Sequence, residues 1–172
     1  LYYWIKPNQI IEKNLIKQEK FFDEDIEFSE FKNLSAKKKE LFVEFIKNNY
    51  MPKKKEKYTP TNDSIISLFE GHNKKSFISL KTYNNKILSS MLTIPLEFYE
   101  NSNKKIIYLA DFLCVDNDHR EKHYASKQIY THIYHIRNTI PEKIALFKRE
   151  NKSNFIVPYT VYNNYIFKID NW

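Results

Sequence analysis

The chain has 172 residues, 42% of them hydrophobic and 16% aromatic, which is typical of one globular domain with an aromatic core and excludes a disordered chain. Its single cysteine cannot form an intramolecular disulfide, and its single glycine excludes the glycine-rich phosphate and dinucleotide loops. No apolar run approaches the roughly 20 residues of a membrane-spanning helix, so we expect a soluble, cytoplasmic protein.

The formal net charge of +7 has two interpretations. One is attraction to a polyanion, either nucleic acid or the phosphates of a nucleotide-type cofactor. The other is a bias in amino-acid usage towards Lys, Asn, Ile and Tyr. The second is favoured because the lysines are scattered and arginine, the better phosphate ligand, occurs three times. Nucleic acid is therefore not the expected partner.

Residues 1–34 are predicted to form an extended, irregular arm that packs on the rest of the chain. The arm is rich in aromatic residues, which must be buried against a sheet edge or a core face: Tyr2, Tyr3, Trp4, Phe21, Phe22, Phe28 and Phe31. Residues 35–172 are predicted to form a single domain without internal repeats.

Local patterns within this domain predict two helices, followed by strands. Each helix has a capping residue before apolar residues at helical spacing, giving Ser35 to Asn48, and Asp63 to Phe69 with Thr61 or Asn62 as the cap. The strands are Phe77–Tyr83 and Ile87–Ile94, a hairpin around Asn84-Asn85, and then Ile106–Val115 after a turn at Asn101–Asn103. A short strand near Lys143–Phe147 and an aromatic segment, Phe155–Trp172, follow the last helix.

The stretch from Lys105 to Arg137 is the part that suggests a chemistry. An apolar strand ends at Val115, a polar loop runs from Asp116 to Lys122, and a helix with apolar residues at helical spacing begins at Ala125. A loop that enters a helix after a buried strand presents unpaired backbone N–H groups, which suit an anionic phosphate. The side chains of Arg120, Lys122 and His123 add charge at the same place.

The same stretch resembles the glycylpeptide N-myristoyltransferases, whose first half is a GNAT-like domain that binds acyl-CoA. The resemblance rests on Phe112-Leu113-Cys114-Val115 followed by Arg120-Glu121-Lys122-His123-Tyr124-Ala125. Further landmarks of that family occur in the same order along the chain: Tyr3-Trp4 with Pro7, Asn49-Tyr50, and Ile94-Pro95. The resemblance therefore covers nearly the whole sequence.

The resemblance implies an α/β fold of the acyl-CoA N-acyltransferase type, with a mixed, mostly antiparallel sheet and flanking helices. It implies that the backbone N–H groups of Phe112 and Leu113 polarise a thioester carbonyl as an oxyanion hole. The residues it implies for binding the acyl-CoA are Tyr2, Tyr3 and Trp4 at the adenine end, and Phe112, Leu113, Cys114, Val115, Arg120, Glu121, Lys122, His123, Tyr124 and Ala125 along the strand end and loop.

The expected function is thus binding of myristoyl-CoA or another long-chain acyl-CoA, with transfer of the acyl group to an N-terminal glycine amine. In the family a second half supplies the base, and here the sequence stops at Trp172. Three explanations stay open: the chain is a fragment, a protein partner or second copy replaces the missing half, or catalysis has been lost. The alternative function is accordingly an inactive GNAT-like subunit that acts as a protein-interaction scaffold. Asp111 could be a local base, although a structural role is favoured.

Four histidines surround the single cysteine in the sequence, which raises the question of zinc. His119, His123, His132 and His135 flank Cys114, but their spacing fits no compact zinc pattern. We therefore expect no metal. A cysteine in an apolar strand is usually an inert small side chain, and we expect the same of Cys114.

Overall fold

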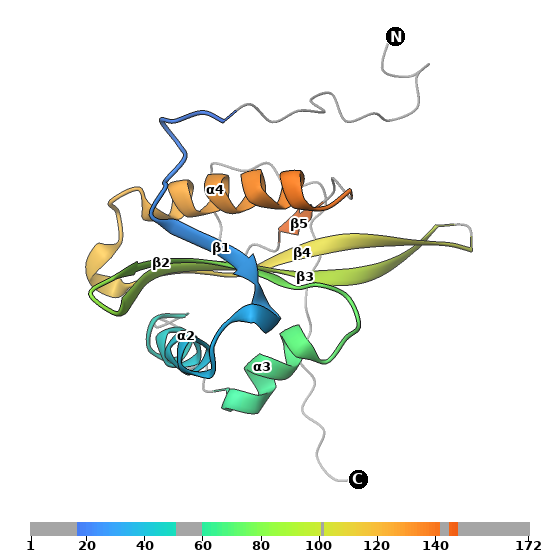
Figure 1. The fold of residues 1–172 in the computed structure, drawn as a ribbon, viewed down its shortest axis with the longest axis horizontal. Coiled ribbons are helices and arrows are strands. Elements are labelled where there is room, and N and C mark those ends of the chain that lie inside the picture. Colours follow the sequence, from blue (N-terminus) through green and yellow to red (C-terminus); the bar gives the residue numbers. More distant parts are fainter. Residues whose placement is uncertain (1–16, 51–59, 101, 142–144, 148–172) are drawn as a thin grey trace, which may run out of the picture.

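The structure is a computed structural model that describes residues 17–50, 60–100, 102–141 and 145–147. Its elements lie in three layers, with α4 on one face of a five-stranded sheet and α2 and α3 on the other (Figure 1). In chain order they are β1 (Ile26–Glu30), η1 (Phe31–Asn33), α2 (Ala36–Asn49), α3 (Asn62–Glu70), β2 (Phe77–Tyr83), β3 (Lys86–Glu100), β4 (Asn103–Val115), η2 (Asn117–His119), α4 (Tyr124–Thr139) and β5 (Ala145–Phe147).

The strands of the sheet follow one another in the order β1-β2-β3-β4-β5. The first four pair as antiparallel neighbours, and β5 runs parallel to β4 from Tyr108↔Ala145 to Ala110↔Phe147. Asn84 and Asn85 turn the β2–β3 hairpin with positive φ angles of 47° and 61°, a conformation that asparagine tolerates well. The mixed, mostly antiparallel sheet with helices on both faces confirms the predicted fold class.

The predicted helix starts are confirmed by their capping contacts. The Ser35 side chain accepts a hydrogen bond from the Lys38 N–H at 3.3 Å, and the Thr61 side chain accepts one from Ser64 at 3.1 Å. These two helices bury an aromatic core against the sheet. Its rings include Phe31, Phe42, Phe69 and Phe112, which meet one another mostly edge to face.

The N-terminal arm differs from the expectation of irregular structure. Residues 26–30 form the edge strand β1, paired with β2 from Ile26↔Lys81 to Glu30↔Phe77. The sequence IEFSE alternates apolar and polar side chains, so Ile26 is buried and the Phe28 ring stacks on Phe77 at 5.5 Å. The domain boundary at residue 34 remains a prediction.

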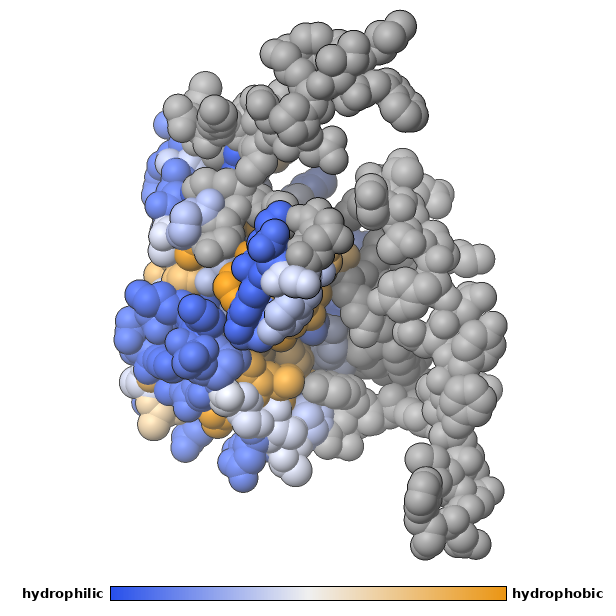
Figure 2. All heavy atoms as spheres, turned by 90° about the vertical axis from the view of Figure 1, so that its right-hand side faces the viewer, coloured by the Kyte–Doolittle hydropathy of each residue, from blue (hydrophilic) through white to orange (hydrophobic). Residues whose placement is uncertain are grey.

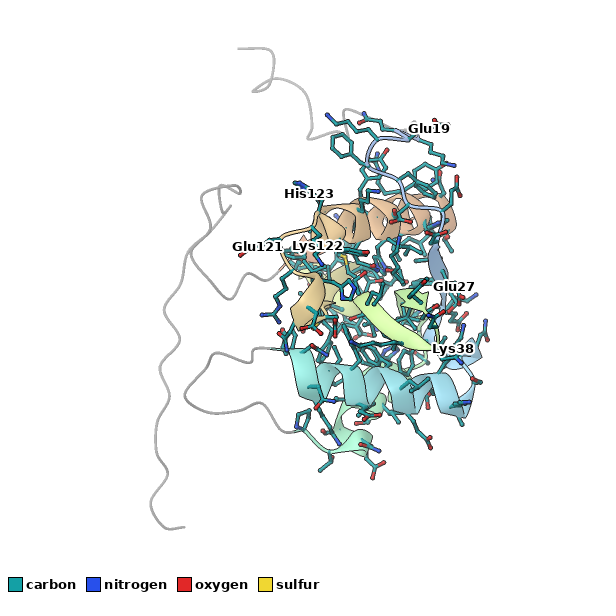
Figure 3. All side chains as sticks on the ribbon, turned by 90° about the vertical axis from the view of Figure 1, so that its left-hand side faces the viewer. Glu19, Glu27, Lys38, Glu121, Lys122 and His123 are labelled. Carbon is teal, nitrogen blue, oxygen red and sulfur yellow. The ribbon has the colours of Figure 1, made fainter. Side chains whose placement is uncertain are left out.

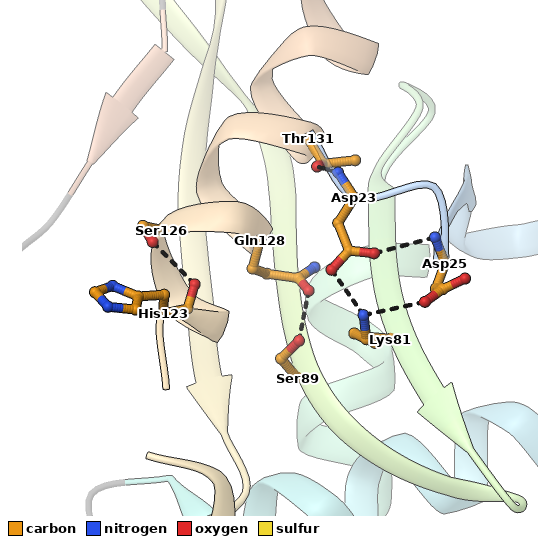
Figure 4. Close-up of polar contacts among 8 residues, drawn as sticks. All are labelled: Asp23, Asp25, Lys81, Ser89, His123, Ser126, Gln128 and Thr131. Carbon is orange, nitrogen blue, oxygen red and sulfur yellow. Dashed lines mark hydrogen bonds and ion pairs between the residues drawn. The ribbon is translucent and has the colours of Figure 1, made fainter. Parts of the chain in front are cut away.

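The segment before β1 packs on α4, as Figure 1 shows. The Gln18 N–H donates to the Tyr130 hydroxyl at 2.8 Å, and the Phe22 ring meets Tyr134 edge to face at 5.1 Å. Closer to β1, the Asp23 N–H donates to the Thr131 hydroxyl at 3.0 Å (Figure 4). The described part of the arm is therefore packed on the domain.

A buried polar network joins α4 to the sheet. Gln128 donates to the Ser79 hydroxyl at 2.6 Å and accepts from Ser89 at 2.7 Å (Figure 4 shows the latter). One turn further along α4, the Nδ1 of His132 lies 2.7 Å from the Ser79 hydroxyl, and its Nε2 lies 3.3 Å from the Thr93 hydroxyl. All five side chains are fully buried, so each hydrogen bond holds the helix in one register on the sheet.

The network requires a neutral imidazole at His132. Burial, together with the nearby His135, lowers the pKa of His132 to about 3. The neutral ring can donate through one nitrogen and accept through the other, which matches the two hydroxyls on either side of it. An imidazolium would donate to both hydroxyls and would carry an uncompensated charge in the core.

We predict that His132 makes the stability of the protein depend on pH. Because its pKa is about 3 when folded and near 6.5 when unfolded, its contribution is complete above pH 6.5 and is lost as the pH falls. The free energy of unfolding should then decrease by up to about 1.4 kcal/mol per pH unit below that value. Urea unfolding at neutral and mildly acidic pH measures this slope.

The matched variant is His132→Gln, which should lose most of this pH dependence. A smaller slope should remain, because burial also lowers the pKa of His135. A variant with the same slope as the wild type would show that His132 is not the group responsible.

Candidate functional site

A β-bulge interrupts the ladder between β3 and β4. Ser90 pairs with Cys114, but Leu92 pairs with Asp111, so Phe112 and Leu113 of β4 stand opposite the single residue Met91. Phe112 has a φ of 49°, in the left-handed region that a bulky side chain rarely adopts. A bulge of this kind takes backbone groups out of the ladder and turns them in a new direction.

The hydrogen bonds of Phe112 show where these backbone groups point. Its N–H donates to the Oδ1 of Asp111 at 2.7 Å, and its carbonyl accepts from the Ser90 hydroxyl at 3.1 Å. The C=O and N–H of a trans peptide point in opposite directions, so the Leu113 N–H points away from the Ser90 hydroxyl. Tyr50, which follows α2, donates its hydroxyl to the same Asp111 oxygen at 3.3 Å.

The bulge lies where the outer edge of β4 is left uncovered by β5. The described part of β5 pairs only with Tyr108 to Ala110. Within the described residues, β3 pairs with one edge of β4 from Asp111 to Val115, and no strand pairs with the other edge. This stretch of the edge leads from the bulge to the loop before α4.

The loop is fixed to the sheet through Asp116. This buried carboxylate contacts the His119 Nδ1 at 2.7 Å and the Lys86 ammonium at 3.1 Å, while its backbone N–H donates to the Leu88 carbonyl at 2.8 Å. Burial alone would raise the pKa of Asp116, but the hydrogen bonds from His119 and Lys86 outweigh burial and lower it. The loop thus begins from a rigid, charged anchor.

Arg120 connects the loop to the end of α2. Its guanidinium donates to the Asn49 carbonyl at 2.8 Å and to the Val115 carbonyl at 3.4 Å. The side chain of Asn49 in turn accepts from the Asn117 N–H at 3.1 Å. Arg120 therefore holds the loop in place, in addition to any contact that its charge makes with a phosphate.

The loop ends in two left-handed residues before α4. Glu121 and His123 have φ angles of 64° and 60°, and His123 gives the helix no side-chain cap. Alternating backbone conformations of this kind let successive N–H groups line a concavity that favours an anion. Glu121, Lys122 and His123 are exposed and lie together at this end of the molecule (Figure 3).

The structure brings most of the predicted site residues together along one path. The bulge residues Phe112 and Leu113, the strand end Cys114 and Val115, and the loop from Arg120 to Ala125 follow one another from β4 into α4. Tyr2, Tyr3 and Trp4 lie outside the described residues. The interpretation of the sequence missed Asn49 and Asp116 as loop anchors, because their partners are distant in the chain. It also missed the hydrogen bond that the Phe112 N–H donates to the Asp111 carboxylate.

Cys114 is buried beside the bulge and has no reactive thiolate. Burial raises the pKa of its thiol to about 12. In the described ranges, no three His, Cys, Asp or Glu side chains are placed to hold a metal ion. Nor is any helix in them long and apolar enough to cross a membrane.

No protein-family model matches the sequence, and no curated protein matches it significantly. Several solved structures match the fold of this chain. An aminoglycoside acetyltransferase from an uncultured soil metagenomic sample, in complex with sisomicin, matches with a TM-score of 0.59 at 15% identity, covering 87% of this chain and 99% of that one. A GNAT family acetyltransferase of Staphylococcus aureus matches with a TM-score of 0.54 at 12% identity, covering 82% and 98%.

A third match is the Saccharomyces cerevisiae N-myristoyltransferase with bound myristoyl-CoA. Its TM-score is 0.55 at 17% identity, with 83% of this chain covered, and the present chain spans about a third (34%) of the yeast enzyme. At these identities the comparisons establish the fold. The chain has the GNAT acetyltransferase fold.

We expect substitution of Arg120 to destabilise the protein more than substitution of its neighbour Lys122. In Arg120→Lys a single ammonium cannot reach both carbonyls, so the free energy of unfolding should fall by about 1–2 kcal/mol. Lys122 is exposed and contacts only the Asp118 carbonyl in the described structure, so Lys122→Ala should change stability by less than about 0.5 kcal/mol. Urea unfolding compares the two, and equal effects would contradict the anchoring role.

The thiol of Cys114 should be nearly unreactive in the folded protein. Because its pKa is about 12, an aromatic disulfide reagent at mildly alkaline pH should react on the order of 100-fold more slowly with the native chain than with the chain in urea. Absorbance of the released thiol follows the reaction. Fast labelling of the native protein would place the thiol on an accessible surface instead.

Proposed function

We propose that this protein binds a long-chain acyl-CoA and transfers its acyl group to an amine. The observation that carries the proposal is the bulge at Phe112-Leu113, which turns backbone N–H groups out of the β4 ladder beside a stretch of edge that no described strand covers. That edge leads directly to the loop and helix start, where backbone N–H groups favour phosphate. An extended ligand with a carbonyl in its middle and phosphates at one end fits the bulge, the strand edge and the loop before the helix.

The chemistry of acyl transfer suits these parts. Attack on a thioester places negative charge on its carbonyl oxygen, and preorganised N–H donors stabilise that charge in the transition state. The strand edge would hold the pantetheine portion by backbone hydrogen bonds and so fix the distance between the bulge and the phosphates. The exposed side chains of Lys122 and His123 lie at the phosphate end.

Myristoyl-CoA as donor and an N-terminal glycine as acceptor are the finer part of the proposal. Two observations support them: the Phe112-Leu113-Cys114-Val115 sequence at the bulge, and the likeness to a yeast enzyme whose structure contains myristoyl-CoA. Because the chain spans only about a third (34%) of that enzyme, the remaining surface of the acceptor site is proposed to come from outside these 172 residues, whether from a further segment, a protein partner or a second copy. The cytoplasmic location stays a prediction.

Exposed apolar side chains favour the second candidate, a protein-interaction scaffold. Phe98 and Tyr99, near the tip of the β3–β4 hairpin, are 46% and 61% exposed. Figure 2 views the molecule from that end and shows hydrophobic atoms at the surface between hydrophilic ones. Such side chains are common at protein interfaces, and the two functions are compatible.

Thermal unfolding with different acyl donors tests the proposal. A ligand that binds only the folded state raises its midpoint, so myristoyl-CoA and palmitoyl-CoA should each give a clear increase at concentrations well above their dissociation constants. Free CoA and acetyl-CoA should give smaller shifts. An equal shift with acetyl-CoA would remove the long-chain part of the proposal, and no shift with any of them would leave the scaffold as the function.

Substitution of the exposed loop lysine locates the phosphate end. Lys122→Ala should weaken myristoyl-CoA binding about two- to five-fold, because an exposed charge contact contributes about 0.5–1 kcal/mol. Lys32→Ala is the matched control, since Lys32 is an exposed lysine in η1. Isothermal titration measures both, and equal affinities would separate the loop from the phosphates.

A further inference from the structure

The carboxylate of Asp111 accepts the hydrogen bond of the Phe112 N–H, the donor that the proposed function assigns to a thioester oxygen. The oxygen Oδ1 lies 2.7 Å from the backbone nitrogen of Phe112, which is a normal hydrogen-bond distance to one of the two donors expected to polarise a carbonyl. The same oxygen accepts from Tyr50 at 3.3 Å. A negatively charged acceptor on this N–H shows that the donor can hold developing negative charge.

We propose that Asp111 is a catalytic residue of this site: its carboxylate covers the Phe112 N–H until a thioester oxygen displaces it, and it then accepts the proton of the attacking amine. This inference rests on the proposed acyl-CoA function. It adds the base, which the bulge and the loop do not themselves supply.

The position of Asp111 makes this role geometrically reasonable. It directly precedes the bulge on β4, so a displaced carboxylate needs only a side-chain rotation and remains within a few ångströms of the carbonyl that replaced it. It is half-buried, so an amine can reach it from outside. Among the described residues, no cationic side chain forms an ion pair with Asp111.

The proposed step balances as follows. An alkylammonium gives one proton to the Asp111 carboxylate, and the nitrogen lone pair forms the C–N bond while the carbonyl π electrons move to oxygen. The N–H groups of the bulge donate hydrogen bonds to the oxyanion and stabilise it. Its collapse breaks the C–S bond, and the CoA thiolate takes the second proton of the nitrogen. The products are an amide and CoA thiol, and Asp111 later releases its proton to water.

A purely structural Asp111 is the competing explanation. Its bond to the next N–H satisfies a donor that the bulge has removed from the ladder, which side-chain acceptors often do. An asparagine would do the same, because its amide oxygen accepts the hydrogen bond but its amide takes up no proton at neutral pH. Asp111→Asn therefore separates the two explanations.

The binding arm compares myristoyl-CoA with its thioether analogue, in which a methylene replaces the carbonyl. The wild type should bind the two with similar affinity, since the gained carbonyl contact is offset by the lost bond to Asp111. Asp111→Ala should bind the thioester about five-fold more tightly or better, with no gain for the thioether. If Asp111→Ala leaves the ratio of the two affinities unchanged, the carboxylate does not compete for the donor.

The kinetic arm measures CoA release from myristoyl-CoA with two probe amines, a peptide with an N-terminal glycine and glycinamide. Asp111→Asn should lower the rate at neutral pH by about 100-fold or more, because a positioned base contributes that much, while thioester binding is retained. Asp63→Asn, an exposed aspartate on α3, is the matched control and should keep the wild-type rate. Asp111→Asn retains a side-chain oxygen that accepts from the Phe112 N–H. The kinetic comparison therefore stays valid even where Asp111→Ala does not fold.

The outcomes distinguish this inference from the proposed function. A wild type that binds neither CoA derivative rejects the proposed function itself. A wild type that binds the thioester but releases no CoA with either amine, or an Asp111→Asn variant as fast as the wild type, overturns the assignment of Asp111 as the base and leaves acyl-CoA binding intact.

Discussion

The rest of the site depends on one extra residue in one strand. Two residues of β4 face Met91 of β3, and this bulge turns the Leu113 N–H away from the Ser90 hydroxyl of β3. Without the extra residue, β4 would continue its ladder, and the N–H groups of Phe112 and Leu113 would point to opposite edges of the strand. The two adjacent N–H groups could then not both turn towards one carbonyl.

The position of the helix start relative to the bulge is set by polar contacts rather than by apolar packing alone. The network of Gln128 and His132 with hydroxyls of β2 and β3 permits one register of α4 on the sheet. Apolar side chains tolerate small shifts, whereas a buried hydrogen bond that is lost leaves a polar group without a partner. Asp116 and Arg120 fix the connecting loop at its two sides in the same way. The distance from the bulge to the start of α4 is therefore well defined.

The fold class was predicted through the resemblance to a known family. The β2–β3 hairpin, both capped helices and the strand–loop–helix stretch were predicted from local patterns: Asn84-Asn85, Ser35, Thr61, and apolar spacing around Ala125. The sequence did not predict β1, since a five-residue edge strand is stabilised by pairing with a distant strand. Nor could it show that Arg120 and Asn49 hold each other, because 71 positions separate them. The bulge itself carries no sequence signal: its residue with positive φ is Phe112 and not a glycine.

That Phe112 tolerates this backbone conformation has a physical explanation on both sides of the residue. A non-glycine residue in the left-handed region costs about 1–2 kcal/mol, and two contacts offset the cost. The ring is 4% exposed and packs against Tyr50, Phe42 and Phe69, while the N–H is bonded to Asp111. Phe42 and Phe69 pack on this ring without hydrogen-bonding to the carboxylate, so this packing can hold the bulge when Asp111 rotates away. The hydrogen bond to Asp111 is thus the support of the bulge that the proposed thioester oxygen would replace.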